Sequence, residues 1–152
     1  MKNFSTYFKS ILIPVLVGAI VGFITSNFID YETLIRPPFS PQGIAFPIVW
    51  TILYILMGIS YGILKSNNLL DSKSNFIYYA QLVINALWSI FFFVFKWRLF
   101  SFFWLLLLIV FVILMIIDFY SKNKWSGLLQ IPYLVWCLFA AYLNFGIYFL
   151  NR

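Results

Sequence analysis

The 152-residue sequence contains no histidine, a single cysteine and only four acidic residues. The absence of histidine removes the commonest general base, the commonest metal ligand and the usual axial ligand of haem. A lone cysteine, Cys137, excludes an internal disulfide bond and a metal site built from several thiolates. We interpret Cys137 as a small packing residue, and we expect neither a bound metal nor a cofactor.

Patterns that usually accompany hydrolytic or transfer chemistry are also missing. The sequence shows no paired carboxylates, no nucleophile–base pair and no glycine-rich phosphate loop. The four acids, Asp30, Glu32, Asp71 and Asp118, fall in connectors or near the ends of apolar runs. Ion-coupled carriers and proton pumps normally keep ionisable groups at membrane depth. Neither an ordinary enzyme nor a standard ion-coupled carrier is indicated.

Charge is scarce throughout the chain. Charged residues make up 9% of the sequence and hydrophobic residues 64%, and the mean hydropathy is +0.97. A soluble domain is about a quarter charged, so this chain has too few polar side chains to cover a water-facing surface. Its ten basic residues are scattered among loop ends. The net charge of +6 therefore indicates membrane anchoring, with lipid as a partner, and not nucleic-acid binding.

Five long apolar runs make up most of the chain. Each is long enough to cross the hydrocarbon core of a bilayer, which takes about 20 residues of helix. The runs do not alternate strictly between polar and apolar residues, so they predict helices and not a barrel. We predict an all-α integral membrane protein, a five-transmembrane-helix bundle with one domain over residues 1–152. The runs are Phe8–Phe28, Ile44–Leu64, Phe76–Phe95, Leu99–Tyr120 and Gly127–Leu150.

An odd number of spans places the two termini on opposite sides of the membrane. The first run is long for a signal peptide and has no small-residue cleavage pattern, so we keep it as a helix. Six lysines fall on the amino-terminal side and four basic residues on the other. This bias weakly favours a cytoplasmic amino terminus under the positive-inside rule.

Aromatic residues are in excess, at 23% of the chain. In the second, third and fifth runs they recur, together with amides, at helical spacing and so share one face of each helix. Because amides that face lipid are costly, Gln81, Asn85 and Asn144 should point inward. These faces either pack the bundle or line a pocket for a large, flat, apolar ligand. Ala140 favours a pocket, because a small residue leaves room among aromatic side chains. The three faces are Trp50, Tyr54, Met57 and Tyr61; Gln81, Asn85 and Trp88; and Tyr133, Trp136, Ala140 and Leu143.

Two GxxxG patterns, Gly18 to Gly22 and Gly58 to Gly62, would let helix backbones approach closely. Contact within the bundle is the simpler interpretation. A seam between two copies of the chain, and hence a homodimer, is the alternative.

The connector after the first run carries an unusual segment, Arg36-Pro-Pro-Phe-Ser-Pro-Gln-Gly43. Pro37, Pro38 and Pro41 restrict the backbone, and the residue before each proline is biased toward extended conformations. We predict a shaped lid over the mouth of a pocket and not a flexible linker.

Three segments of this chain resemble the TspO/MBR family, which comprises bacterial tryptophan-rich sensory proteins and the mitochondrial translocator protein, or peripheral benzodiazepine receptor. The resemblance covers the whole chain. Many relatives carry an acid early in the fourth helix, where this chain reads Phe102-Phe-Trp-Leu-Leu-Leu-Leu108, so no role of that carboxylate carries over. The segments are the proline-rich run with Phe46-Pro-Ile-Val-Trp-Thr-Ile-Leu-Tyr54; Gln81-Leu-Val-Ile-Asn-Ala-Leu-Trp-Ser89 with Phe91-Phe92; and Pro132-Tyr-Leu-Val-Trp-Cys-Leu-Phe-Ala-Ala-Tyr-Leu-Asn144.

The resemblance implies an often dimeric five-helix bundle whose pocket opens near the first loop and binds porphyrins, sterols or other lipids, and benzodiazepine-site ligands. Trp50 and Trp136 match tryptophans implicated in a light-dependent breakdown of protoporphyrin by some bacterial members, which makes them the candidates for a catalytic role. By matching position, the pocket would be lined by Trp50, Tyr54, Asn85, Trp88, Trp136, Ala140 and Leu143.

Three functions therefore stay open. The favoured one is a membrane receptor or sensor for tetrapyrroles or similar planar apolar molecules, with Asn85 offering a hydrogen bond. Without histidine, a metal-free porphyrin fits as well as haem. The second is a transporter of tetrapyrroles or lipids, which the lack of intramembrane charge and of repeated halves argues against. The third is light-dependent porphyrin degradation by Trp50 and Trp136. We expect a multi-pass protein of a bacterial cell membrane.

Overall fold

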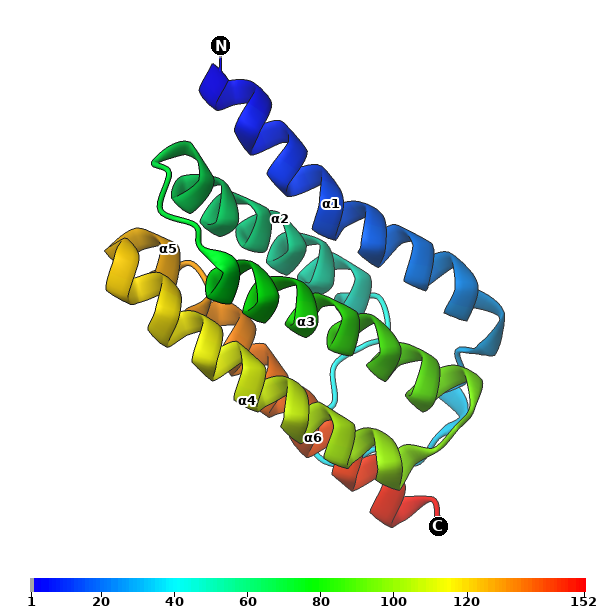
Figure 1. Cartoon of the computed structure of the whole chain (residues 1–152). Coiled ribbons are helices and arrows are strands. Elements are labelled where there is room, and N and C mark those ends of the chain that lie inside the picture. Colours follow the sequence, from blue (N-terminus) through cyan, green and yellow to red (C-terminus); the bar gives the residue numbers. More distant parts are fainter. Residues whose placement is uncertain (1) are drawn as a thin grey trace.

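The computed structural model describes residues 2–152, and its regular elements are all helices (Figure 1). Five of the helical segments are long and apolar enough to cross a membrane, so the predicted five-helix membrane bundle is confirmed. The elements are α1 (Lys2–Thr25), η1 (Ser26–Phe28), η2 (Tyr31–Thr33), α2 (Ala45–Ser66), α3 (Ser72–Ser89), η3 (Ile90–Val94), α4 (Arg98–Lys122), α5 (Lys124–Leu128) and α6 (Ile131–Leu150).

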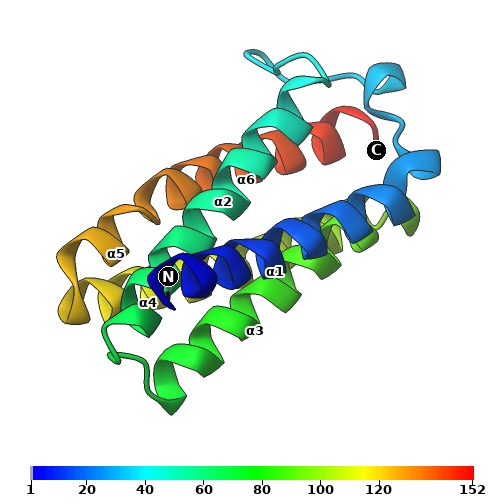
Figure 2. The same cartoon turned by 90° about the horizontal axis from the view of Figure 1, so that it is seen from above.

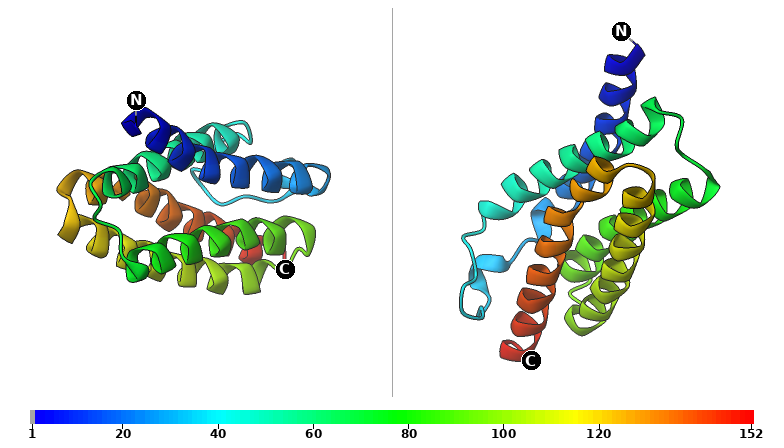
Figure 3. Two further views of the ribbon diagram at one scale, coloured as in Figure 1. Left: turned by 45° about the horizontal axis from the view of Figure 1, so that its top comes forward. Right: turned by 90° about the vertical axis from the view of Figure 1, so that its left-hand side faces the viewer.

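The two chain termini lie at opposite ends of the bundle (Figure 1). The carboxyl terminus shares its end with the connector of residues 26–44, and we call this the loop end (Figure 3). The amino terminus, the α2–α3 turn and the short helix α5 lie at the other end, the amino-terminal end. Helix α1 packs mainly on α2, whereas α4 packs on both α3 and α6 (Figures 1 and 2).

Helix boundaries differ from the predicted runs where polar side chains cap the helices. Asp71 accepts a hydrogen bond from the Ser74 backbone nitrogen at 2.8 Å, so α3 begins four residues before the predicted run. Asn123 caps α5 in the same way, and Pro132 opens α6 in the first turn, where proline is tolerated. The predicted fifth run therefore consists of two helices, α5 and α6. The predicted third run ends in a π-helical turn, η3.

Helices α1 and α2 are in closest contact toward the amino-terminal end. A Cβ atom placed on Gly58 would collide with the backbone of Ile11, and one on Gly62 would lie 2.7 Å from the Tyr7 ring. Glycine at these two positions is what lets the helices approach. The second GxxxG pattern therefore works within the chain, as the simpler interpretation proposed.

The two glycines of the first GxxxG pattern lie in different environments. A Cβ on Gly18 would collide with the Tyr54 ring, whereas a Cβ on Gly22 would meet no described atom within 4 Å. Three of the four glycines thus pack against other residues of the same bundle. A homodimer remains a prediction.

Candidate ligand-binding site

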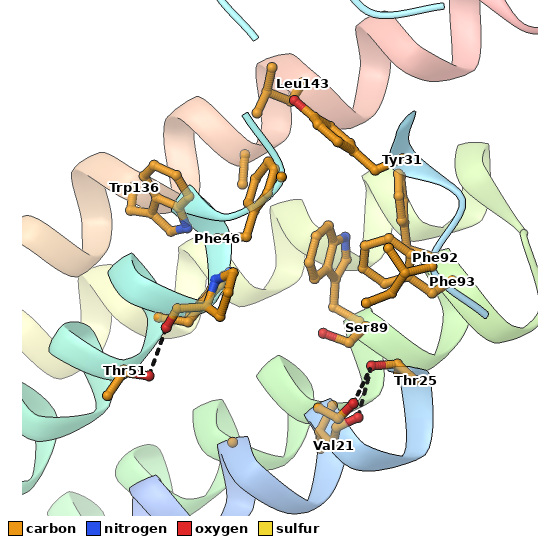
Figure 4. A pocket seen from close by; sticks show the side chains of 18 of the residues that line it. Val21, Thr25, Tyr31, Phe46, Thr51, Ser89, Phe92, Phe93, Trp136 and Leu143 are labelled. Atoms are coloured by element: carbon orange, nitrogen blue, oxygen red, sulfur yellow. Dashed lines mark hydrogen bonds between the residues drawn. The ribbon is translucent and has the colours of Figure 1, made fainter. Parts of the chain in front are cut away.

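A cavity of about 700 Å³ lies at the loop end, between α1, α2, α3 with η3, and α6 (Figure 4). Its volume is in the range typical of small-molecule sites, which is about 300–1,000 Å³. Aromatic side chains from different helices form two of its sides.

The first side, which we call the α2–α6 wall, consists of Phe46, Trp50 and Trp136. The ring centroids of Trp50 and Trp136 are 6.5 Å apart and nearly perpendicular, and those of Phe46 and Trp136 are 5.8 Å apart. Tyr54 stacks on Trp50 at 5.7 Å, one turn farther from the loop end. Such edge-to-face and stacked pairs stabilise a fixed arrangement of rings.

The second side, the α3 wall, consists of Trp88, Phe92 and Phe93. Trp88 stacks on Phe92 with centroids 5.3 Å apart and meets Phe93 edge-on at 6.4 Å. Its indole nitrogen donates to the Asn144 side-chain oxygen at 2.9 Å, and Asn144 donates to the Arg98 carbonyl at 2.8 Å. Trp88 is therefore held in place by α6 and α4. Figure 4 shows Phe92 and Phe93 opposite Phe46 and Trp136.

Helix α1 forms the third side with small and aliphatic residues. Gly18, Ala19 and Gly22 line the cavity together with Val15 and Val21. No described atom comes within 4 Å of a Cβ placed on Gly22, so the cavity extends to the α1 backbone there. The open volume thus results from short side chains on α1 facing two aromatic walls.

A chain of buried hydrogen bonds forms the floor of the cavity. The Tyr54 hydroxyl donates to Asn85 Oδ1 at 2.7 Å, Asn85 Nδ2 donates to the Tyr133 oxygen at 2.8 Å, and Tyr133 donates to Gln81 Oε1 at 2.7 Å. Asn85 is 2% exposed and lies behind the cavity surface, so its amide holds Tyr54 and Tyr133. Tyr54 lines the cavity, whereas Asn85, Tyr133 and Gln81 do not.

The proline-rich connector is fastened to α6. Pro37 is buried against Gly146, where a Cβ would lie 2.6 Å from the proline ring, so only glycine fits there without a shift. The Tyr142 hydroxyl donates to the Pro38 carbonyl at 2.7 Å. These contacts give the connector a defined shape. That it acts as a lid over the cavity stays a prediction.

Further hydrogen bonds hold both ends of this connector. Asn151 accepts from the Ile35 nitrogen at 3.0 Å and donates to the Ile35 carbonyl at 2.7 Å. The Tyr31 hydroxyl donates to the Pro41 carbonyl at 2.6 Å. The prolines themselves lie outside the cavity lining, to which the connector contributes Ile29, Tyr31, Glu32, Gly43 and Ile44.

An ion-pair cluster joins the connector to the start of α4. Asp30 accepts two hydrogen bonds from Arg98, both at 2.8 Å, and one from Lys96 at 3.1 Å. Burial raises the pKa of the Asp30 carboxyl, but the bonds from Arg98 and Lys96 outweigh it and leave the pKa below its usual value. The backbone carbonyl of Arg98 also accepts a hydrogen bond from Asn144. The cluster is therefore linked to Asn144, the residue that holds Trp88.

Residues 10–150 of the chain match a family model whose description is TspO/MBR family. The chain belongs to the TspO/MBR family. It is 39% identical over 145 residues to a tryptophan-rich protein TspO of Archaeoglobus fulgidus, covering 93% of this chain and 94% of that protein. The resemblance predicted from the sequence is confirmed.

Two bacterial relatives support the same assignment. The chain is 36% identical to a tryptophan-rich protein TspO of Chlorobaculum tepidum, covering 86% of this chain and 89% of the relative. It is 34% identical to a tryptophan-rich sensory protein of Cereibacter sphaeroides, and the match covers 80% of this chain and 76% of the relative. With its five apolar spans, this protein is an integral, multi-pass membrane protein.

The structure brings six of the seven predicted pocket residues to the cavity surface, and Asn85 lies directly behind it. Sequence reasoning missed Phe46 and the α1 residues. Phe46 precedes Trp50 by four positions, so extending the same helical face by one turn would have found it. The six residues are Trp50, Tyr54, Trp88, Trp136, Ala140 and Leu143. That they contact a ligand stays a prediction.

Proposed function

We propose that this protein is a membrane receptor that binds a planar, largely apolar ligand of the tetrapyrrole class in the loop-end cavity. The observation that carries the proposal is the pair of aromatic walls, Trp50 with Trp136 on one side and Trp88 on the other, around an open volume of about 700 Å³. Aromatic faces bind flat apolar molecules by stacking and by removing their surface from water.

The polar groups of the cavity support a ligand with an apolar body. Thr25 donates to the Val21 carbonyl at 2.9 Å, and Thr51 donates to the Pro47 carbonyl at 2.7 Å, so these hydroxyls bond their own helices. The Tyr54 hydroxyl donates to Asn85 and can still accept a hydrogen bond. Shape and stacking would therefore select the ligand, with Tyr54 as one polar contact.

Sterols and other lipids are the competing ligands for the same cavity. Tryptophan fluorescence distinguishes them, because three indoles line the cavity. We expect saturable quenching on titration with metal-free protoporphyrin in detergent or vesicles, and weaker or no competition by a sterol. Quenching that rises linearly without saturation would contradict a specific site, and tighter binding of the sterol would change the ligand class.

Light-dependent porphyrin degradation is the second candidate function. The adjacency of Trp50 and Trp136 favours it, because a porphyrin in the cavity would meet both indoles before it met solvent. The double variant Trp50→Phe and Trp136→Phe keeps aromatic bulk and removes the indoles. If illuminated, aerobic samples of this variant bleach protoporphyrin at the parent's rate, the indoles have no chemical role and the receptor function is left standing.

A further inference from the structure

We infer that ligands enter the cavity from the lipid phase, through a slot between α1 and the loop-end half of α2. The natural ligand is then a molecule that dissolves in the bilayer and presents its apolar body at the level of the acyl chains. The inference rests on the proposed function, since it concerns how the same cavity is filled.

The slot is marked by residues that line the cavity and are also exposed. On α1 these are Ala19 and Gly22, and on α2 they are Pro47 and Thr51. Helices α1 and α2 lie together near the amino terminus and separate toward the connector (Figure 2). Past Gly18, which contacts the Tyr54 ring, no described atom fills the space next to a Cβ on Gly22.

This slot lies at membrane depth. The rim residues fall within the two spans Asn3–Phe28 and Ala45–Ser66. Ala19 is nine residues before Phe28, which corresponds to about 13 Å along a helix with a rise of about 1.5 Å per residue. Beside it, Ile20 and Phe23 are 57% and 82% exposed, as expected of side chains that face lipid. The opening therefore faces acyl chains and not water.

Two other routes into the cavity, past the connector and between α2 and α6, are closed by side chains. The connector is held on α6 by Tyr142 and Asn151, which donate to backbone carbonyls. Between α2 and α6 there is a lipid-facing groove, and Trp136 lines both this groove and the cavity. Its indole therefore separates the two spaces. The slot beside Gly22 needs no such side chain to move.

The interfacial end of the slot indicates the chemistry of the ligand. Among the described residues that line the cavity, Glu32 is the one charged side chain, and it lies 3.6 Å from Arg36 at the connector. The rest of the slot is lined by small, aliphatic and hydroxyl side chains. An amphipathic molecule would keep its polar edge at this charged pair while its apolar body moves between the helices.

The test is the rate of ligand exchange in proteoliposomes, with protoporphyrin supplied from donor vesicles and tryptophan quenching followed by stopped flow. Gly22→Phe puts a ring into the slot. Because a blocked route slows entry and exit alike, whereas a loss of affinity alone would speed exit, we expect both rate constants to fall by about tenfold or more. Ile20→Phe adds bulk on the lipid-facing side of α1 and should leave both rates unchanged.

A second variant addresses the connector route. Tyr142→Phe removes the hydrogen bond to Pro38, and under lipid entry it leaves both rates unchanged. Faster exchange in Tyr142→Phe overturns the slot, as do parent rates in Gly22→Phe or slower association without slower dissociation. In these cases the receptor function stands. Absence of saturable quenching in the parent protein overturns the proposed function itself and the slot with it.

Discussion

The two ends of the α1–α2 pair use glycine in opposite ways. Toward the amino-terminal end, Gly58 meets the backbone of Ile11 and Gly62 meets the Tyr7 ring, so each glycine allows close packing. At the loop end Gly22 meets no described atom within 4 Å, and its missing side chain leaves open volume. The same four-residue spacing thus closes one end of the bundle and opens the other.

The difference is explained by where the aromatic residues of α2 point. At the loop end Phe46 and Trp50 pack on Trp136 of α6. Tyr54 contacts α1 at Gly18. Beyond it, a Cβ on Gly22 would meet no described atom within 4 Å. A cavity therefore forms where the aromatic face of α2 has turned toward α6.

The largest effect should come from adding bulk at the closed end. Gly58→Leu would place a side chain against the α1 backbone, which cannot give way, so we expect a loss of about 2–3 kcal/mol in the free energy of unfolding. Gly22→Leu enters open space and adds a better helix former, so stability should change by less than about 1 kcal/mol. Denaturation of both variants in the same detergent measures the difference. Equal destabilisation would contradict the contrast between the two ends.

The second largest effect concerns ligand affinity. Trp136→Ala removes an aromatic residue of the cavity wall, and loss of such a contact commonly costs at least about 1.4 kcal/mol, or tenfold in Kd. Trp125 lies at the amino-terminal end and is 65% exposed, so Trp125→Ala should leave the Kd for protoporphyrin nearly unchanged. Fluorescence titration compares the two variants. Similar losses in both would show adsorption to the surface.

The third effect tests the connector. Changing Pro37, Pro38 and Pro41 together to glycine raises the flexibility of the segment that carries Tyr31 and Gly43 to the cavity. Because holding a loop in its bound shape lowers the entropic cost of binding, we expect affinity to fall by about threefold without unfolding of the bundle. If the triple variant binds as tightly as the parent, the connector does not shape the site.

The spans and most of the cavity surface follow from patterns in the sequence. Long apolar runs determine the five helices, and helical spacing places Trp50 and Tyr54, and Trp136 and Ala140, on common faces. The same spacing places Asn85 and Trp88 on one face of α3. It does not show how far along that face the cavity extends. In the structure Tyr54 and Tyr133 bond Asn85, and these bonds form the cavity floor.

Other features depend on contacts that no local pattern specifies. The π-helical turn η3 changes the register at the end of α3 and brings both Phe92 and Phe93 to the cavity. The apolar run over the fifth span hides the break between α5 and α6, since Leu128 and Leu129 continue its hydropathy. The open side at Gly22 results from the absence of a neighbour, which depends on where α2 and α6 pack.

The smallest effects should come from acidification and from the two paired carboxylates. Asp30 at the loop end is bonded by Arg98 and Lys96 and has a lowered pKa, while Asp71 at the amino-terminal end is bonded by Lys122 at 2.7 Å and Ser74 and also has a lowered pKa. A lowered folded-state pKa stabilises the fold at pH values above the unfolded pKa of about 4, and this stability is lost as pH falls through the folded value.

We therefore expect stability to decrease below about pH 4 and Asp30→Asn to flatten part of this decrease. The Asp30 side chain is 25% exposed and that of Asp71 is 58% exposed, so water screens the Asp71 pair more strongly. At neutral pH, Asp71→Asn should therefore change stability less than Asp30→Asn does. Melting temperatures measured from pH 3 to pH 7 compare the two. A larger loss in Asp71→Asn would mean that the connector's ion pairs do not hold the loop end together.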